Sequence, residues 1–389
     1  MGTPAGKNES RTARLNALLS SFLRTRWQPT WPAPVSGAEA TALVEQAQAE
    51  GVAPLLYTQV RGRGLFPPPS EEILRLAYLA NAARNFFLFR ELEKVLLALS
   101  SQDISVLLLK GAALGPAVYG NPALRPLGDL DLLVRPADAP RALEVLAAHG
   151  YAPLHPPLRP ASLLEDENEV FLRRQSGADL ELHWSLFDFP HYRYHLPMEL
   201  FWSNARPLAI GGASAWMLGP EDQILHLCAH LVLHHGGEQP RLLWFHDVAE
   251  VIAHDSGQLD WAALLERARD CDLFLPLQQV LPHLAGEWKV PIPPSILERL
   301  QETRPSPAEC SLHVRLAAQR RSVARRFWEG LAGRPTWTAR LRFAWDHLFP
   351  SPTYMRERYA IRHAWLLPFY YPYRWLLGLR SAFLSRSKP

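Results

Sequence analysis

Cysteine is scarce in this chain: its 389 residues include only Cys228, Cys271 and Cys310. Three widely spaced thiols exclude a disulfide framework and a cysteine-rich zinc cluster. We therefore expect a protein of a reducing compartment, the cytoplasm.

Long hydrophobic runs are also lacking, because no stretch reaches the roughly 20 apolar residues that a membrane span needs. The nearest one, WLLPFYYPYRWLLGL, is interrupted by Pro368, Pro372 and Arg374. The N-terminal residues lack the apolar core of a signal peptide. We expect no transmembrane segment, and at most a peripheral membrane contact through the aromatic stretch.

Charge is sparse in total, at 20% of residues, and unevenly placed. From residue 301 onward the chain has 16 Lys and Arg against 5 Asp and Glu, whereas the first 300 residues have 25 against 33. A basic tail on an acidic body favours an anionic partner, such as RNA, a membrane surface or an acidic protein. A tail that is solvated, or packed on the body, explains the asymmetry equally well.

Hydrophobic residues make up 48% of the chain, which predicts a folded protein of two or three structural units. Apolar residues at three- and four-residue spacing predict a helix from Ser70, its N-cap, to about Leu99. The expected segments are a polar lead-in (1–36), an N-terminal helical region (37–100), an α/β core (101–205), a helical region on the substrate side (206–300) and a basic aromatic helical tail (301–389).

The pattern of the core predicts a small mixed β-sheet. DISVLLLKG and DLDLLVRP are typical of buried strands, and the segments that follow them, AALGPAVYG and ADAPRALEVLAAHGY, are typical of helices. VFLRRQ and ADLELHWSL predict a hairpin that turns at Ser176 and Gly177. The fold class is therefore α+β, with a small mixed sheet flanked by N-terminal and C-terminal helical regions.

Carboxylates on two of these strands form a candidate metal site. Asp129 and Asp131 are two residues apart in a strand pattern, so we expect both side chains on one face. Glu181 and His183 alternate in the same way on a later strand. If the strands are neighbours, three carboxylates converge on a site suited to Mg²⁺. A pair of exposed structural acids explains Asp129 and Asp131 equally well.

The residues before this pair are candidates for binding a triphosphate. Lys110 and Gly111 end a strand and open a helix, where backbone N–H groups and an ammonium group favour phosphate. Arg125 is a further candidate cation, and Gly128 lets the backbone approach a ligand closely. A helix-start glycine and a surface lysine are the structural alternatives for Gly111 and Lys110.

The segments KGAAL, GDLDLLV and ELHW, with Tyr119 and Arg125 between them, resemble the uncharacterised bacterial nucleotidyltransferase-like family of the DNA polymerase β superfamily. The resemblance covers residues 70–270. It implies Asp129, Asp131 and Glu181 as ligands of two Mg²⁺ or Mn²⁺ ions, and places Lys110 and Gly111 at the nucleotide. The first motif departs from the superfamily pattern, because Lys-Gly-Ala replaces Gly-Gly or Gly-Ser and its spacing to Asp129 is longer.

Histidines recur downstream. His226, His230 and His234 are spaced by four residues on a predicted helix, and Asp247 follows His246 on the next. Three interpretations stay open: helix packing, a substrate-facing role and a bound transition metal. The His246–Asp247 pair is also similar to the His-Asp pair of metal-dependent phosphohydrolases.

The tail combines arginines and aromatic residues in RLAAQRRSVARRFWEG and WLLPFYYPYRWLLGLR. Such a segment binds RNA through phosphate pairing and base stacking. It can equally dock on membrane lipid, or pack its aromatic side on the body.

These patterns together predict an enzyme that transfers a nucleoside monophosphate from an NTP to an unidentified acceptor, which is RNA, a protein or a small molecule. Glu181 would act as general base, and Lys110 with Arg125 would neutralise the phosphates. His183 would orient Glu181 or the acceptor. The substrate-side candidates are His183, His230, His234 and Asp247.

Two alternatives remain. The first is a non-catalytic nucleotide-binding or scaffold protein of a biosynthetic cluster that retains the fold. The weaker one is a metal-dependent phosphohydrolase that uses His246 and Asp247.

Overall fold

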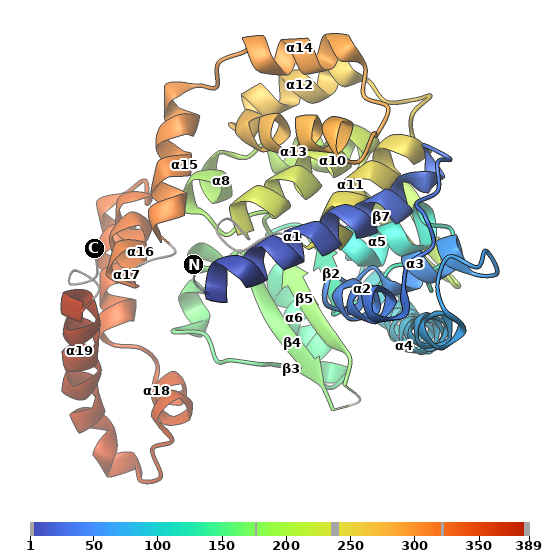
Figure 1. Ribbon diagram of the computed structural model, residues 1–389. Helices are drawn as coiled ribbons and strands as arrows, with labels where there is room; N and C mark the ends of the chain where they lie inside the picture. Colours follow the sequence, from blue (N-terminus) through green and yellow to red (C-terminus); the bar gives the residue numbers. More distant parts are fainter. Residues whose placement is uncertain (1–3, 176, 235–240, 320–322, 385–389) are drawn as a thin grey trace. The chain divides into compact units, whose positions relative to one another are not determined.

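The computed structural model describes residues 4–175, 177–234, 241–319 and 323–384 (Figure 1). The chain divides into two compact units. The first consists of residues 1–132 and 199–306, and the second of residues 133–198 and 307–389.

The first unit opens with helices where no element is predicted before residue 37. Its first elements are α1 (Pro4–Leu23), η1 (Arg24–Arg26), α2 (Gly37–Ala49) and α3 (Ala53–Val60). The C-terminal turns of α1 bury Leu19, Phe22 and Leu23, and α1 packs against α2 and α3. The first residues of α1 are polar, so the pattern there contains no sign of its apolar C-terminal turns. The segment expected as a polar lead-in, residues 1–36, therefore contains a packed helix.

Helix α4 (Pro68–Ser100) begins earlier than the sequence predicts. Its N-cap is Pro67, so the prediction of Ser70 as the cap is wrong. Proline at the first helical positions fits because its fixed φ suits the helix and its missing N–H would have no intrahelical partner there. Ser70 is buried in the first turn instead.

The core of the first unit contains β1 (Leu107–Leu108), α5 (Lys110–Ala117) and β2 (Leu130–Leu133), as predicted. After α9 (Met198–Ser203), the chain forms an unpredicted hairpin of β6 (Arg206–Ile210) and β7 (Ala213–Met217). Gly211, in its two-residue turn, has a φ of 58°, a conformation that favours glycine. The region expected to be helical over 206–300 therefore begins with a β-hairpin.

The rest of the first unit is helical, with α10 packed against both α11 and α13 (Figure 1). Its elements are α10 (Pro220–Ala229), the π-helix η3 (His230–His234), α11 (Leu242–His254), α12 (Trp261–Asp270), α13 (Phe274–Gly286) and α14 (Pro294–Glu302).

The second unit contains the predicted hairpin. Strand β4 (Glu169–Arg174) pairs antiparallel with β5 (Asp179–His183), and β3 (Tyr151–Pro153) pairs with β4. Helix α6 (Ala139–Ala148) packs beside β3 (Figure 1). Between β3 and β4 the chain forms η2 (Pro160–Ser162) and α7 (Leu163–Asp166), and after β5 it forms α8 (Pro190–His195).

The tail forms further helices of the second unit. They are α15 (Pro307–Gln319), α16 (Val323–Ala332), α17 (Trp337–Leu348), α18 (Pro352–Tyr359), η4 (Ala364–Leu366) and α19 (Leu367–Leu384). Arg320 and Arg321 of the arginine-rich run lie outside the described residues. Among the residues that are described, no helix is long and apolar enough to cross a bilayer.

The strands form one seven-stranded sheet in the order β3-β4-β5-β2-β1-β7-β6. It is mixed, because β1 pairs parallel with β7 whereas the β4–β5 and β6–β7 pairs are antiparallel. The predicted fold class, a mixed sheet flanked by helical regions, is confirmed. The sheet is larger than expected because β3 and the β6–β7 hairpin were not predicted.

Candidate metal centre

Strand β2 presents Asp131 beside Lys110. The N–H of Leu109 donates to the backbone oxygen of Asp131 (3.0 Å), which fixes the start of α5 next to β2. Lys110 Nζ then donates to Asp131 Oδ1 at 2.7 Å, and both side chains are largely buried. Lys110 also has a φ of 44°, which is uncommon for a residue other than glycine. The backbone therefore holds this ammonium group against the carboxylate.

The loop before β2 contains Gly128 and Asp129. Arg84 Nη2 donates to the backbone oxygen of Gly128 at 2.9 Å, which anchors the loop to α4. Gly128 is exposed, and a side chain there would have open space. Asp129 is half-buried and precedes the strand, which starts at Leu130. The alternation predicts that both aspartates are strand residues, but only Asp131 lies in the strand.

Strand β5 carries Glu181 and His183 on one face, as their two-residue spacing predicts. Both side chains are buried, so the expected outward direction does not mean contact with solvent. His183 Nε2 lies 3.4 Å from Glu181 Oε2. The register of the hairpin brings Glu169 of β4 opposite His183.

Glu169 is a residue of the site that the sequence analysis missed. Its Oε2 lies 2.7 Å from His183 Nδ1, although the two groups are not aligned as a hydrogen bond, and accepts from Asn168 Nδ2 at 3.0 Å. A negative charge beside Nδ1 favours the tautomer with its proton there, which leaves the lone pair on Nε2. The turn expected at Ser176 and Gly177 would oppose residue 169 to 184, one residue from the observed partner, so the sequence indicated this neighbour only approximately.

Asp131, Glu181 and His183 each offer one ligand atom, and these atoms lie within 4.8 Å of one another. We call these three residues the acidic cluster; all are buried. The N–H of Val134, just after β2, donates to the backbone oxygen of His183 (2.9 Å), in agreement with the neighbouring positions of β2 and β5. Two carboxylates and an imidazole are a donor set that fits a divalent cation. His183 stands in this cluster where the sequence predicts Asp129.

Arg125 lies elsewhere than predicted. Its side chain is buried, and Nη2 donates to Asp247 Oδ2 at 2.8 Å. Burial lowers the pKa of its guanidinium, but Asp247 more than offsets this and holds the pKa above its ordinary value. A side chain on Gly111 would overlap the Arg125 guanidinium and Leu127. The missing side chain of Gly111 therefore leaves room for the Arg125 guanidinium.

Asp247 belongs to a buried polar network with Arg125, Tyr119 and His246. Tyr119 Oη donates to Asp247 Oδ1 at 2.8 Å and lies 3.0 Å from His246 Nδ1. Burial, and then the charge of Asp247, hold the pKa of Tyr119 well above its ordinary value, so the phenol stays neutral. We call these four residues the buried network.

Glu250 lies next to the buried network. Its Oε1 is 3.6 Å from His246 Nε2, and Arg26 Nε approaches Oε2 at 2.9 Å. Burial lowers the pKa of His246 to about 3 and raises that of Glu250 to about 7. His246 is therefore a neutral, packed imidazole.

The histidine stripe packs helices. His226 of α10 stacks on His230 with ring centroids 6.4 Å apart, and His230 meets the Trp244 ring edge-on at 5.9 Å. The side chain of His234 lies outside the described residues. Among the described residues, the acidic cluster is the single group of three or more potential metal ligands close enough to share an ion.

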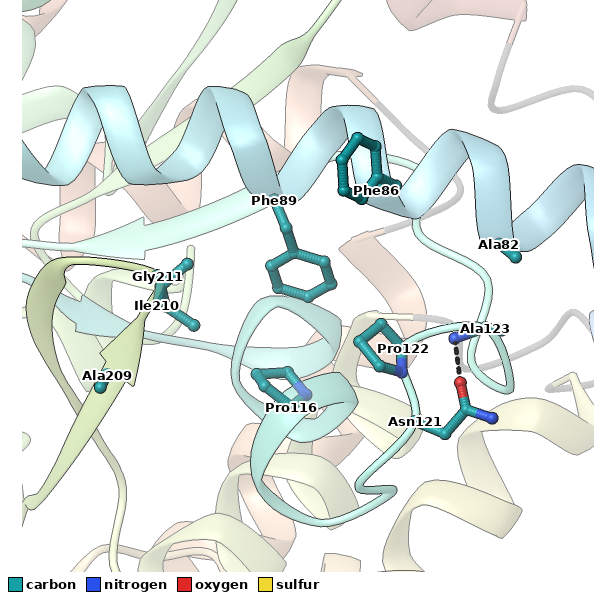
Figure 2. A pocket seen from close by; sticks show the side chains of 10 residues that line it. All are labelled: Ala82, Phe86, Phe89, Pro116, Asn121, Pro122, Ala123, Ala209, Ile210 and Gly211. Carbon is teal, nitrogen blue, oxygen red and sulfur yellow. Dashed lines mark hydrogen bonds between the residues drawn. The ribbon is translucent and has the colours of Figure 1, made fainter.

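An apolar pocket of about 380 Å³ lies between α4, α5 and the β6–β7 turn (Figure 2). Figure 2 shows Phe89 directed from α4 toward Pro116 of α5, with Pro122 beside them. The polar side chain of the lining, Asn121, bonds within the protein, to the N–H of Ala123 at 2.9 Å and to Tyr78 at 3.1 Å. This lining is unsuited to a triphosphate.

Comparison with known proteins identifies a sequence family. Residues 36–288 match the family described as "Uncharacterised nucleotidyltransferase". The solved structure of an antigenic nucleotidyltransferase-like protein from Paracoccidioides brasiliensis is 17% identical, with a TM-score of 0.35 over 54% of this chain and 95% of that one. No curated protein matches the chain.

Proposed function

The chain belongs to the uncharacterised nucleotidyltransferase family, and from this we propose that it transfers a nucleoside monophosphate from an NTP to an acceptor in a metal-dependent reaction that releases pyrophosphate. The observation that carries the proposal is the acidic cluster, in which three donor atoms lie within 4.8 Å of one another. A site with this donor set would hold Mg²⁺ or Mn²⁺.

Asp131, Glu181 and His183 would bind one cation, and Asp129, at the edge of β2, would help to hold a second. Bound divalent cations would supply charge neutralisation for the triphosphate and a lower pKa for the acceptor hydroxyl. The imidazole of His183 makes the donor set softer than three carboxylates, which favours Mn²⁺ over Mg²⁺.

Protein side chains would carry out the remaining chemistry. Glu181 accepts the proton of the acceptor hydroxyl, and the oxygen of that hydroxyl attacks the α-phosphorus of the NTP. The bond from that phosphorus to the bridging oxygen breaks, and its electron pair leaves with pyrophosphate. Lys110 is already 2.7 Å from Asp131, and its ammonium group neutralises the departing charge.

Arg125 would contribute indirectly. Its guanidinium packs against Gly111, so it supports the backbone that positions Lys110. His183 would direct its Nε2 lone pair to the cation beside Glu181, whose Oε2 lies 3.4 Å from that nitrogen.

A second candidate is a nucleotide-binding protein without catalysis. It is favoured by the position of Arg125, because a cation expected at the phosphates is instead paired with Asp247. The phosphohydrolase hypothesis has no such support. His246 and Asp247 are buried and bonded to Tyr119, and Asp247 also neutralises Arg125.

The test is transfer of label from nucleotides. Purified protein is incubated with Mn²⁺ or Mg²⁺, a total cell extract, and each NTP labelled at either the α- or the γ-phosphate. Label from the α-position should enter an acceptor, that from the γ-position should leave as pyrophosphate, and Asp131→Asn should abolish both.

The fraction that gains label identifies the acceptor as RNA, protein or small molecule. Transfer of the γ-label would contradict nucleotidyl transfer. If a metal and an NTP raise the melting temperature of wild type but not of Asp131→Asn, while no label moves, the non-catalytic alternative is correct.

A further inference from the structure

Helix α19, at the end of the described chain, has two distinct faces. One face packs on the end of α17 and the loop that follows it. There Tyr371 Oη donates to the backbone oxygen of Pro350 (2.9 Å) and Trp375 Nε1 to that of Leu348 (2.8 Å). Arg374 lies on this side too, stacked over the ring of Tyr354 at 5.3 Å. These contacts fix which side of the helix faces outward.

The outward face is apolar. It exposes Trp365 of η4 and then Phe369, Tyr373 and Leu376 at three- and four-residue spacing, and we call these four residues the apolar stripe. Trp365, Phe369 and Leu376 are each more than 60% exposed. Contiguous exposure of this kind on a helix marks an interaction site.

Positive charge surrounds the stripe. Residues 351–384 contain five arginines and no lysine, against the single acid Glu357. Arg362 precedes η4, and Arg380 is four residues after Leu376; both are exposed. The surface therefore presents an apolar centre with cationic ends.

We propose that η4 and α19 lie in the plane of an anionic phospholipid surface, with the apolar stripe in the acyl boundary and Arg362 and Arg380 at the headgroups. Tryptophan and tyrosine favour the interface between headgroups and acyl chains. An amphipathic helix with cationic ends binds there through buried apolar area and attraction to anionic lipid. RNA explains this surface less well, since an exposed leucine neither stacks on bases nor pairs with phosphate.

This inference does not depend on nucleotidyl transfer. The surface lies outside residues 36–288, the part of the chain that matches the family.

The test is sedimentation of the full-length protein with vesicles of phosphatidylcholine, with and without phosphatidylglycerol. We expect binding to the anionic vesicles, weakened by salt. Phe369→Ser/Leu376→Ser should reduce the partition coefficient on the order of 100-fold, because two apolar side chains no longer enter the membrane. Arg362→Gln/Arg380→Gln should reduce it about fivefold per arginine, and only on anionic vesicles.

The matched control is Leu76→Ser/Leu79→Ser, which alters exposed leucines on α4 and should bind lipid like wild type. Circular dichroism verifies that each variant is folded. Equal binding by the stripe variant and wild type would overturn the proposal. So would binding to single-stranded RNA but not vesicles, or a self-association that the stripe variant removes.

Discussion

Two buried groups of histidine and carboxylate side chains differ in how their charges are used. In the buried network, Asp247 is bonded to the guanidinium of Arg125 and to the hydroxyl of Tyr119. In the acidic cluster, Asp131, Glu181 and His183 direct donor atoms toward one another. The buried network pairs its one carboxylate with Arg125, whereas the acidic cluster places Glu181 and His183 beside a carboxylate, Asp131, that is paired with Lys110.

The comparison shows that residue type alone does not define a metal site. His246 and Asp247 look like ligands in the sequence, but an arginine 122 residues away neutralises the acid. Buried carboxylates near each other are unfavourable unless a cation compensates them. Lys110 compensates Asp131, and the acidic cluster adds a second carboxylate, Glu181, and an imidazole within 4.8 Å of it, which is a donor set for a cation. The buried network has one carboxylate, Asp247, already bonded to Arg125 and Tyr119, as in a structural element.

The largest expected effect comes from Asp247→Asn. Removing one partner of a buried ion pair leaves Arg125 charged and unpaired, which lowers the free energy of unfolding by about 3–5 kcal/mol. Urea denaturation measures this change. Asp179→Asn is the control, because its pair with Arg173 is exposed and should contribute little. Equal urea midpoints for the two variants would show that the buried pair of Asp247 and Arg125 contributes no more to stability than the exposed pair.

Next in size is the effect of Glu169→Gln on metal affinity. The neutral amide no longer holds the proton of His183 on Nδ1, so Mn²⁺ should bind about tenfold to 100-fold more weakly. The free Mn²⁺ signal in electron paramagnetic resonance titrations gives the affinity. Stability should change little. If affinity stays at the wild-type value, Glu169 has no role in positioning the imidazole.

A pair of glycine variants tests the support of the Lys110 backbone. In Gly111→Ala the new methyl group overlaps Arg125 and Leu127, so we expect a loss of about 1–3 kcal/mol of stability. Gly128→Ala meets open space and should stay within about 0.5 kcal/mol of wild type. Thermal unfolding compares them, and a harmless Gly111→Ala would show that the packing is loose.

The smallest effect is a pH dependence of stability in the buried network and Glu250. Burial lowers the pKa of His246 to about 3, so protonation of the unfolded chain below about pH 6.5 costs stability as pH falls. Burial raises the pKa of Glu250 to about 7, so ionisation of the unfolded chain above about pH 4.5 costs stability as pH rises.

These two contributions offset one another between about pH 4.5 and 6.5 in wild type. Single variants should therefore show opposite slopes of at most about 1.4 kcal/mol per pH unit. Glu250→Gln should lose stability toward low pH, and His246→Gln toward pH 7. Slopes of the same sign would contradict the assigned charge states.

Local patterns predicted much of the fold. Alternation located β4 and β5, because adjacent strands leave a clear period-two signal. Ser176 of the expected turn lies outside the described residues. The β6–β7 hairpin was missed although its two central turn residues, Gly211 and Gly212, are typical of a hairpin. Ser70 was mistaken for a cap because the helix already begins within the three prolines that precede it.

The candidate site was predictable only in part. Strand periodicity predicted Glu181 and His183 on one face, and Asp131 beside them if the two strands are neighbours; the acidic cluster contains all three residues. The position of Arg125 was not predictable, since its partner Asp247 lies on α11, brought near by tertiary packing. Long-range pairing of this kind leaves no local signature.

The most direct test of the acidic cluster is pulsed electron paramagnetic resonance of Mn²⁺ added to the full-length protein. If the cluster binds the ion, the spectrum should show nitrogen coupling from the His183 imidazole, which disappears in His183→Asn. Asp131→Asn should weaken binding by at least about tenfold. Tightly bound Mn²⁺ without nitrogen coupling, or with affinity unchanged in Asp131→Asn, would contradict the account.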